Sequence, residues 1–168
     1  LLSCAAALGW AYSLPPLALA WRSLGEVVNA FLGGMLLPVY GYFILMGSVD
    51  SFVLNAAAPF ALLTFVNLLA TNWSDRHADT LVGKRTLVTL LSPAQLRHLY
   101  TLIISLAYLC VFWHSPFPPN VMWASALVVP ISLWGRWRYT RQHNPAPSVY
   151  GMVAFLLMQW VGWAGLVR

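Results

Sequence analysis

The feature that most constrains this chain is a series of five long apolar segments joined by short polar connections. They run from about Ser23 to Met46, Phe52 to Asn72, Leu99 to Trp113, Asn120 to Trp134 and Val149 to Val167. Only 8% of the 168 residues are charged, whereas soluble domains carry roughly 25%. So few charges cannot cover a water-facing surface, and the segments lack the polar alternation of membrane barrel strands. The sequence therefore predicts an all-α, multi-pass transmembrane helical bundle.

A shorter apolar run, "LLSCAAALGWAY", opens the chain. As a helix it would span roughly 18 Å, which is less than the roughly 30 Å thickness of a bilayer core. It begins without Met and without the basic region of a signal peptide. We interpret it as the end of a spanning helix that starts upstream. Residues 1–168 are then a single transmembrane domain fragment, the C-terminal portion of a larger protein.

The basic residues of the connections fall almost entirely on one side of the predicted bundle. The connections around residues 13–22, 73–98 and 136–147 hold eight of the nine Lys and Arg residues, and the other side holds only Arg168. Because basic loops stay in the cytoplasm, this side is predicted to be cytoplasmic. The net charge of +5 then suits loops that lie near anionic lipid headgroups. We expect the lipid bilayer as a partner, and no nucleic acid.

The acidic residues concentrate at the cytoplasmic end of the second segment, within "NWSDRHADTLVGKRTL". Asp75 and Asp79 are spaced i, i+4, so their carboxylates share one face of a helix, and Asn72 lies on the same face. Further polar residues continue this line back along the segment, namely Thr71, Asn67 and Thr64. Exposure of such a face to lipid would be costly. The polar face is therefore expected to line the bundle interior or a water-filled cavity.

Two carboxylates one helical turn apart repel each other and need a cation. Carboxylate and amide oxygens suit Mg²⁺, which takes one or two carboxylates and keeps other positions for water and phosphate. The spacing therefore suggests a Mg²⁺ site formed by Asp75, Asp79 and Asn72, with Lys84 and Arg85 as cations beside a bound diphosphate. A second interpretation stays open, in which the turn is a solvated helix end and Lys84 and Arg85 only fix the topology.

Residues 71–91, "TNWSDRHADTLVGKRTLVTLL", resemble the second aspartate-rich motif of the UbiA superfamily of intramembrane prenyltransferases. Residues 12–26, "YSLPPLALAWRSLGE", look like the connection between the fourth and fifth helices of that family. The "GKRTL" and "LGE" features are closest to the dihydroxynaphthoate polyprenyltransferases of the menaquinone branch. The chlorophyll-synthase branch shares the "YSxPP" element. The resemblance covers nearly the whole chain.

Family members have nine membrane helices, so the resemblance implies a partial fold from the end of helix four to helix nine. It implies Mg²⁺-dependent transfer of a polyprenyl group from a polyprenyl diphosphate to an aromatic acceptor in menaquinone-like quinone biosynthesis. The membrane would be that of a bacterial or archaeal cell. By this resemblance Asp75 and Asp79 are catalytic metal ligands, Asn72 binds metal and diphosphate, and Lys84 and Arg85 bind the diphosphate.

The chain also departs from the family pattern. Thr80 stands where a basic residue is usual, and His77 stands where an acidic residue is common, which would alter the phosphate contacts. We do not find the first aspartate motif of the family in these residues, so we expect this fragment alone to be inactive. An alternative function stays open, a non-catalytic membrane scaffold or transporter half whose acidic turn binds a cation.

The sequence "SLGE" precedes the first long apolar segment and fits a capping box formed by Ser23 and Glu26. Alternatively, Glu26 contacts the acceptor. Asn29 and Gly33 lie on the same helical face as Glu26, where they either extend that face into a cavity or allow close helix packing. Tyr12 either borders the active site or anchors the chain at the membrane interface.

Overall fold

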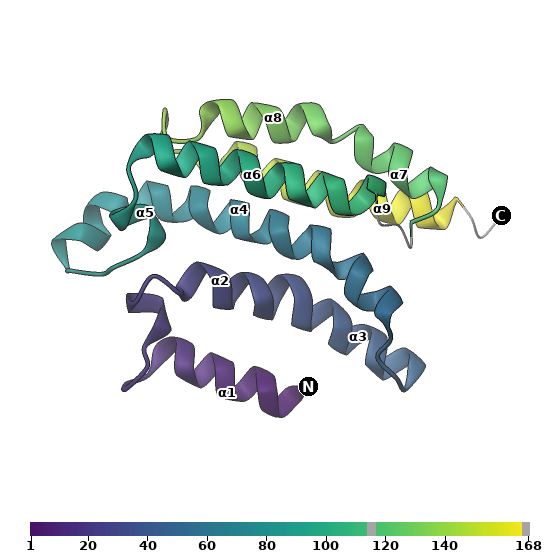
Figure 1. Cartoon of the computed structure of the whole chain (residues 1–168), viewed down its shortest axis with the longest axis horizontal. Coiled ribbons are helices and arrows are strands. Elements are labelled where there is room, and N and C mark those ends of the chain that lie inside the picture. The colour runs from purple at the N-terminus through teal and green to yellow at the C-terminus, as the bar shows by residue number, and fades with distance from the viewer. Residues whose placement is uncertain (114–116, 166–168) are drawn as a thin grey trace.

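The computed structural model describes residues 1–113 and 117–165, and these residues are helical without a strand (Figure 1). The predicted all-α membrane bundle is therefore confirmed. The α-helices are α1 (Leu2–Ser13), α2 (Gly25–Ala30), α3 (Leu37–Met46), α4 (Ser51–Leu81), α5 (Leu87–Leu90), α6 (Pro93–Trp113), α7 (Pro119–Ala126), α8 (Val129–Arg138) and α9 (Ala146–Ala164). Two other elements complete the order, the 3₁₀-helix η1 (Leu19–Trp21) and the π-helix η2 (Phe31–Leu36).

Three helical stretches in the described residues are long and apolar enough to cross a membrane, namely Gly25–Met46, Ser51–Leu81 and Pro93–Trp113. The first consists of α2, η2 and α3 without a break. The second, α4, continues past the predicted end of the apolar segment at Asn72 and has 31 residues. At 1.5 Å per residue it is about 46 Å long, so its last turns extend beyond a 30 Å hydrocarbon core.

The fourth predicted segment is two short helices, α7 and α8, with a break between Ala126 and Val129 that Figure 1 shows clearly. Pro130 lies in the first turn of α8. Because proline has no backbone N–H, it is tolerated there but would weaken a continuous helix at this point. The two pieces pack against α9, so the segment still forms one side of the bundle.

Helix α4 occupies the centre of the bundle, with α6 and α9 on one side and α2, η2 and α3 on the other (Figure 1). The main core lies on the α6 and α9 side and includes Leu69, Leu96 and Phe155, each completely buried. Many apolar side chains stay on the outside, for example Leu45, which is 83% exposed. An apolar exterior of this kind suits lipid.

The connections from α1 to α2, from α4 to α6 and from α8 to α9 lie at the same end of the bundle (Figure 1). These are the connections in which the sequence places most of the basic residues. The last turns of α4, which carry the aspartates, also lie at this end. The basic connections and the acidic turn are therefore neighbours in the fold.

Candidate functional site

The polar face of α4 meets α2 at a single buried carboxylate. Asn72 donates from Nδ2 to Oε1 of Glu26 at 3.0 Å, and the backbone N–H of Leu87 donates to the same oxygen at 3.0 Å. Glu26 is 2% exposed, and its other oxygen, Oε2, is buried without a hydrogen-bond partner among the described residues. One carboxylate oxygen thus joins α2, α4 and α5, while the second is unused.

The predicted capping box of Ser23 and Glu26 is wrong. Helix α2 begins after Leu24 and has no side-chain cap. Ser23 instead donates to the carbonyl oxygen of Arg85, from its backbone N–H at 2.6 Å and from its hydroxyl at 3.2 Å. Contacts between segments far apart in the sequence therefore replace the local pattern, and they attach the start of α2 to the loop after α4.

Asp79 and Lys84, both predicted as site residues, are brought together by the turn that ends α4. Lys84 Nζ lies 3.1 and 3.2 Å from the two carboxylate oxygens of Asp79, which is 8% exposed. Gly83 has a φ of +70°, a left-handed conformation that glycine adopts without strain. This conformation lets the chain reverse direction after α4. The backbone N–H of Lys84 also donates to the carbonyl of Asp79 at 2.9 Å.

The other predicted site residues make fewer contacts with one another. Asp75 is exposed and makes no hydrogen bond or ion pair to any residue that the structure describes. The side chain of Arg85 is also exposed. Asn72 contacts Glu26 instead of either aspartate. The predicted site residues are therefore close in the sequence, but only some of them contact one another.

The donor set can be compared with what Mg²⁺ requires. No group of three or more His, Cys, Asp or Glu side chains is placed to hold a metal within residues 1–113 and 117–165. Mg²⁺ needs only one or two carboxylates when substrate phosphates and water complete its coordination. Among the described residues, Asp75 offers a carboxylate with both oxygens unpaired, and Asp79, whose oxygens contact Lys84, follows one turn later on the same helix. The residues present fit an ion of this kind.

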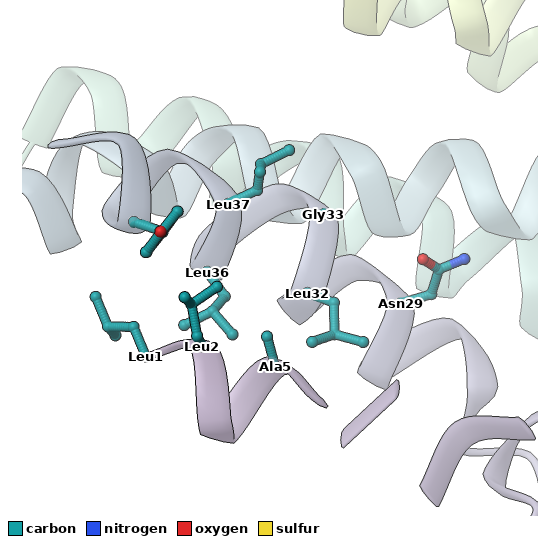
Figure 2. Close-up of a pocket in the computed structure, with 9 residues that line it drawn as sticks. Leu1, Leu2, Ala5, Asn29, Leu32, Gly33, Leu36 and Leu37 are labelled. Atoms are coloured by element: carbon teal, nitrogen blue, oxygen red, sulfur yellow. The ribbon is translucent and has the colours of Figure 1, made fainter. Parts of the chain in front are cut away.

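Two cavities adjoin this region. The smaller, of about 70 Å³, is polar and lies between α2, α4 and the loop after α4; its lining includes Tyr12, Glu26, Asn29, Asn72, Lys84 and Thr86. The larger, of about 440 Å³, is apolar and lies between α1 and the helix from α2 to α3 (Figure 2); its lining is Leu1, Leu2, Ala5, Asn29, Leu32, Gly33, Leu36, Leu37 and Tyr40. Asn29 lines both cavities. Of the two interpretations of Asn29 and Gly33, the cavity-lining one is confirmed.

The π-helix η2 forms one wall of the apolar cavity. Two adjacent glycines in it face different surroundings. A Cβ at Gly34 would lie 2.5 Å from the Cα of Ala61 on α4, whereas a Cβ at Gly33 would meet no atom within 4 Å. Gly34 therefore allows close packing of η2 against α4, whereas Gly33 leaves open space. Single π-helical turns inside α-helices frequently occur at functional sites.

A model of the UbiA prenyltransferase family matches residues 1–160. The chain belongs to this family. No curated protein and no solved structure shows a significant match to it. Membership of the UbiA family confirms the superfamily resemblance of residues 71–91. It also makes the chain a membrane-embedded transferase that moves prenyl groups from prenyl diphosphates to aromatic acceptors in general.

The contact that sequence reasoning missed in this UbiA-family chain is the pair of Glu26 and Asn72, which are 46 positions apart. Glu26 is one of only four acidic residues. A sequence signal was present, because Glu26, Asn29 and Gly33 follow at steps of three and four and so form one polar, open face. That spacing does not indicate which helix lies opposite this face.

Proposed function

We propose that the full-length protein catalyses Mg²⁺-dependent transfer of a polyprenyl group to a dihydroxynaphthoate-like acceptor, at the cytoplasmic face of the membrane, in menaquinone-like quinone biosynthesis. The observation that carries this proposal is the pair of cavities that share Asn29. A polyprenyl diphosphate has a charged head and a long apolar tail. The polar cavity, lined by Asn72 and Lys84, adjoins the end of α4, where the head would bind, and the apolar cavity matches the tail. The "GKRTL" and "LGE" features support the menaquinone branch.

The diphosphate head would bind at the end of α4. Asp75 and Asp79 would hold Mg²⁺, which when bound neutralises the charge that develops on the leaving diphosphate. Asn72 binds Glu26 through its amide nitrogen, so its amide oxygen is the atom that it would offer to the metal or to a bound water.

Lys84 has two roles in this scheme. Without substrate it balances the charge of Asp79 at 3.1 Å. When a diphosphate binds, its ammonium group can donate charge-assisted hydrogen bonds to phosphate oxygens as well. Arg85 is the next residue and is exposed, so its guanidinium can reach a bound phosphate from the aqueous side. Both side chains would make the departing diphosphate a better leaving group.

The apolar cavity would hold the first part of the prenyl tail. Its leucine-rich walls exclude water from the allylic centre that becomes positive as the C–O bond breaks. Tyr12 lines the polar cavity and Tyr40 the apolar one, and an aromatic ring face near such a cation stabilises it. The electron-rich acceptor ring then forms the new C–C bond as the diphosphate leaves, and it regains aromaticity by losing a proton from the attacked carbon, or CO₂ where that carbon carries a carboxylate. Family membership favours this reaction over a non-catalytic scaffold.

The experiment compares Asp75→Asn and Asp79→Asn with the wild type, each in the full-length protein in lipid vesicles. We expect each variant to lower Mg²⁺-dependent transfer of a labelled prenyl group to dihydroxynaphthoate by at least about 100-fold, since each removes electrostatic stabilisation of the leaving group. Binding of Mn²⁺, followed by electron paramagnetic resonance, should weaken by about 10- to 100-fold. This second measurement reports on the metal site independently of turnover.

The matched control is Asp50→Asn, the same substitution at the opposite end of α4. Asp50 caps this helix by accepting from the backbone N–H of Val53 at 3.1 Å, and asparagine caps a helix about as well as aspartate. Transfer and Mn²⁺ binding should be unchanged in this variant. Wild-type turnover and Mn²⁺ binding in both Asp75→Asn and Asp79→Asn would contradict the proposed roles.

A further inference from the structure

The carboxylate of Glu26 uses only one of its two oxygens. Oε1 accepts from Asn72 and from the backbone of Leu87, whereas Oε2 is buried and has no partner among the described residues. A buried polar atom left without a hydrogen bond costs roughly 1–3 kcal/mol, and more when it is charged. Each such atom calls for an explanation, such as a catalytic role or a bound water or ion. The described residues contain seven of them, and the one on Glu26 belongs to a residue that lines the polar cavity.

The surroundings of Glu26 indicate which kind of ligand would fill this position. Glu26 lines the polar cavity together with Lys84, but Lys84 directs its ammonium group to Asp79. A carboxylate oxygen accepts hydrogen bonds or binds a cation. Because Glu26 belongs to no group of three or more His, Cys, Asp or Glu side chains placed to hold a metal in the described residues, the partner inferred for it is a hydrogen-bond donor. Diphosphate oxygens at neutral pH are acceptors and are excluded. A hydroxyl group is the simplest donor that an uncharged part of a substrate can offer.

The size of the polar cavity constrains how that hydroxyl would arrive. A cavity of about 70 Å³ is far smaller than the roughly 300–1,000 Å³ of sites that enclose a whole ligand. It can admit the hydroxyl edge of an aromatic ring. The rest of the ring would lie toward Asn29, where the polar and apolar cavities adjoin. The ring would then lie beside the start of the prenyl tail.

We infer that Oε2 of Glu26 accepts a hydrogen bond from a ring hydroxyl of the aromatic acceptor. Glu26 is then a specificity-determining residue that reads a hydroxyl group of the acceptor. This inference rests on the proposed function and adds to it the group that recognises the acceptor. Asn72 and Leu87 act as positioning groups, since their two hydrogen bonds fix the carboxylate at the wall of the polar cavity that Glu26 lines.

The test compares binding of a dihydroxynaphthoate with binding of its dimethyl ether, measured by quenching of tryptophan fluorescence with the chain in lipid nanodiscs. The wild-type chain should prefer the hydroxyl form by at least about tenfold, the size expected for a hydrogen bond to a charged group. In Glu26→Gln the amide oxygen can keep the bonds to Asn72 and Leu87. The amide nitrogen then takes the Oε2 position and cannot accept. The preference should fall to about one.

Two further measurements separate recognition from folding. Ser125→Ala removes another completely buried oxygen without a hydrogen-bond partner in the described residues, on α7 and outside both cavities; it should keep the wild-type preference. Glu26→Gln should also keep wild-type affinity for a prenyl diphosphate, because the diphosphate does not contact Oε2. Loss of that affinity would show that Glu26 only supports the local fold, and would overturn the inference.

The failure of this inference can be distinguished from the failure of the proposed function. An unchanged hydroxyl preference in Glu26→Gln would show that water satisfies Oε2, and would overturn the inference while prenyl transfer by the wild-type full-length protein stands. Absence of prenyl transfer by the wild-type full-length protein in its native membrane would contradict the proposed function itself.

Discussion

The polar contacts on the two sides of α4 are of opposite kinds. Between α6 and its neighbours α8 and α9, the hydroxyls of buried side chains form closed pairs: Tyr108 with Ser132 at 2.8 Å, and Tyr100 with Ser148 at 2.7 Å. On the α2 side, Glu26 has one oxygen in use and one unpaired. Buried atoms without a partner in the described residues also occur on the first side, on Ser125 and Gln159, but neither of these residues lines one of the two cavities, whereas Glu26 lines the polar one.

The glycines show the same contrast in packing. On the closed side, a Cβ at Gly162 of α9 would lie 2.7 Å from the backbone Cα of Val121 on α7. On the open side, Gly33 has no atom within 4 Å of that position and lines the apolar cavity. In a membrane bundle, small residues usually allow close helix contact. Gly162 follows that rule, and so does Gly34, whose Cβ would lie 2.5 Å from the Cα of Ala61, whereas Gly33 leaves open space beside the apolar cavity.

This comparison suggests how function can be located in an apolar bundle. Polar residues within a membrane protein are expensive, so each one has a structural or a functional role. Polar residues in mutually satisfied pairs hold helices together. Polar residues with unused atoms beside a cavity are the candidates for chemistry. By this criterion the site lies between α2, α4 and the loop after α4.

The comparison of the two sides is tested most strongly by Gly162→Ala and Gly33→Ala, of which Gly162→Ala should change the stability more. At Gly162 the added methyl group must push apart two backbones, which should lower the free energy of unfolding by about 2 kcal/mol. At Gly33 the methyl group enters open space, and the helix preference of alanine should raise stability by about 0.5 kcal/mol. Reversible unfolding in mixed micelles measures both. Equal effects of the two substitutions would remove the distinction between a closed and an open side.

A larger side chain at Gly33 tests what the open space is for. Gly33→Leu should fill part of the apolar cavity and lower kcat/KM for a long-chain prenyl diphosphate by about tenfold, with a smaller effect on a short-chain one, because a pocket that loses room discriminates by about that factor. Transfer assays with both substrates give the chain-length ratio, which is kcat/KM for the long-chain substrate divided by kcat/KM for the short-chain one.

The matched control is Gly41→Leu on α3. Gly41 also has no atom within 4 Å of its Cβ position, but it does not line the apolar cavity. The chain-length ratio should be that of the wild type. A fall in the ratio in both variants would mean that the effect comes from the helix and not from the cavity.

Much of the fold followed from hydropathy, because lipid requires helices with internally paired backbones. The contact of Asp79 with Lys84 was also predictable in kind, since the two residues are five positions apart and a glycine precedes the lysine. Hydropathy placed the end of the apolar segment near Asn72, and the helix continues to Leu81. The apolar residues end near the predicted membrane boundary, whereas the polar residues that follow still form a helix.

The rest of the site depended on contacts between distant segments. "SLGE" fits a local capping box, yet Ser23 bonds to Arg85 and Glu26 bonds to Asn72. A pattern of four residues cannot report which helix will lie opposite. The π-helix likewise had no signal beyond the adjacent glycines 33 and 34, because an extra residue in a turn depends on what each face of the helix meets.

The smallest effect is expected on the closed side. Tyr108→Phe removes the hydroxyl that pairs with Ser132 and keeps the ring that packs against Phe155 at 6.1 Å between centroids. Hydrogen bonds between membrane helices contribute about 0.6 kcal/mol on average, so unfolding in mixed micelles should become easier by about that amount. Prenyl transfer and Mn²⁺ binding should not change, because the pair lines neither of the two cavities. A loss of transfer without a loss of stability would place part of the function on the closed side, and the division of the molecule into a structural half and a catalytic half would then be wrong.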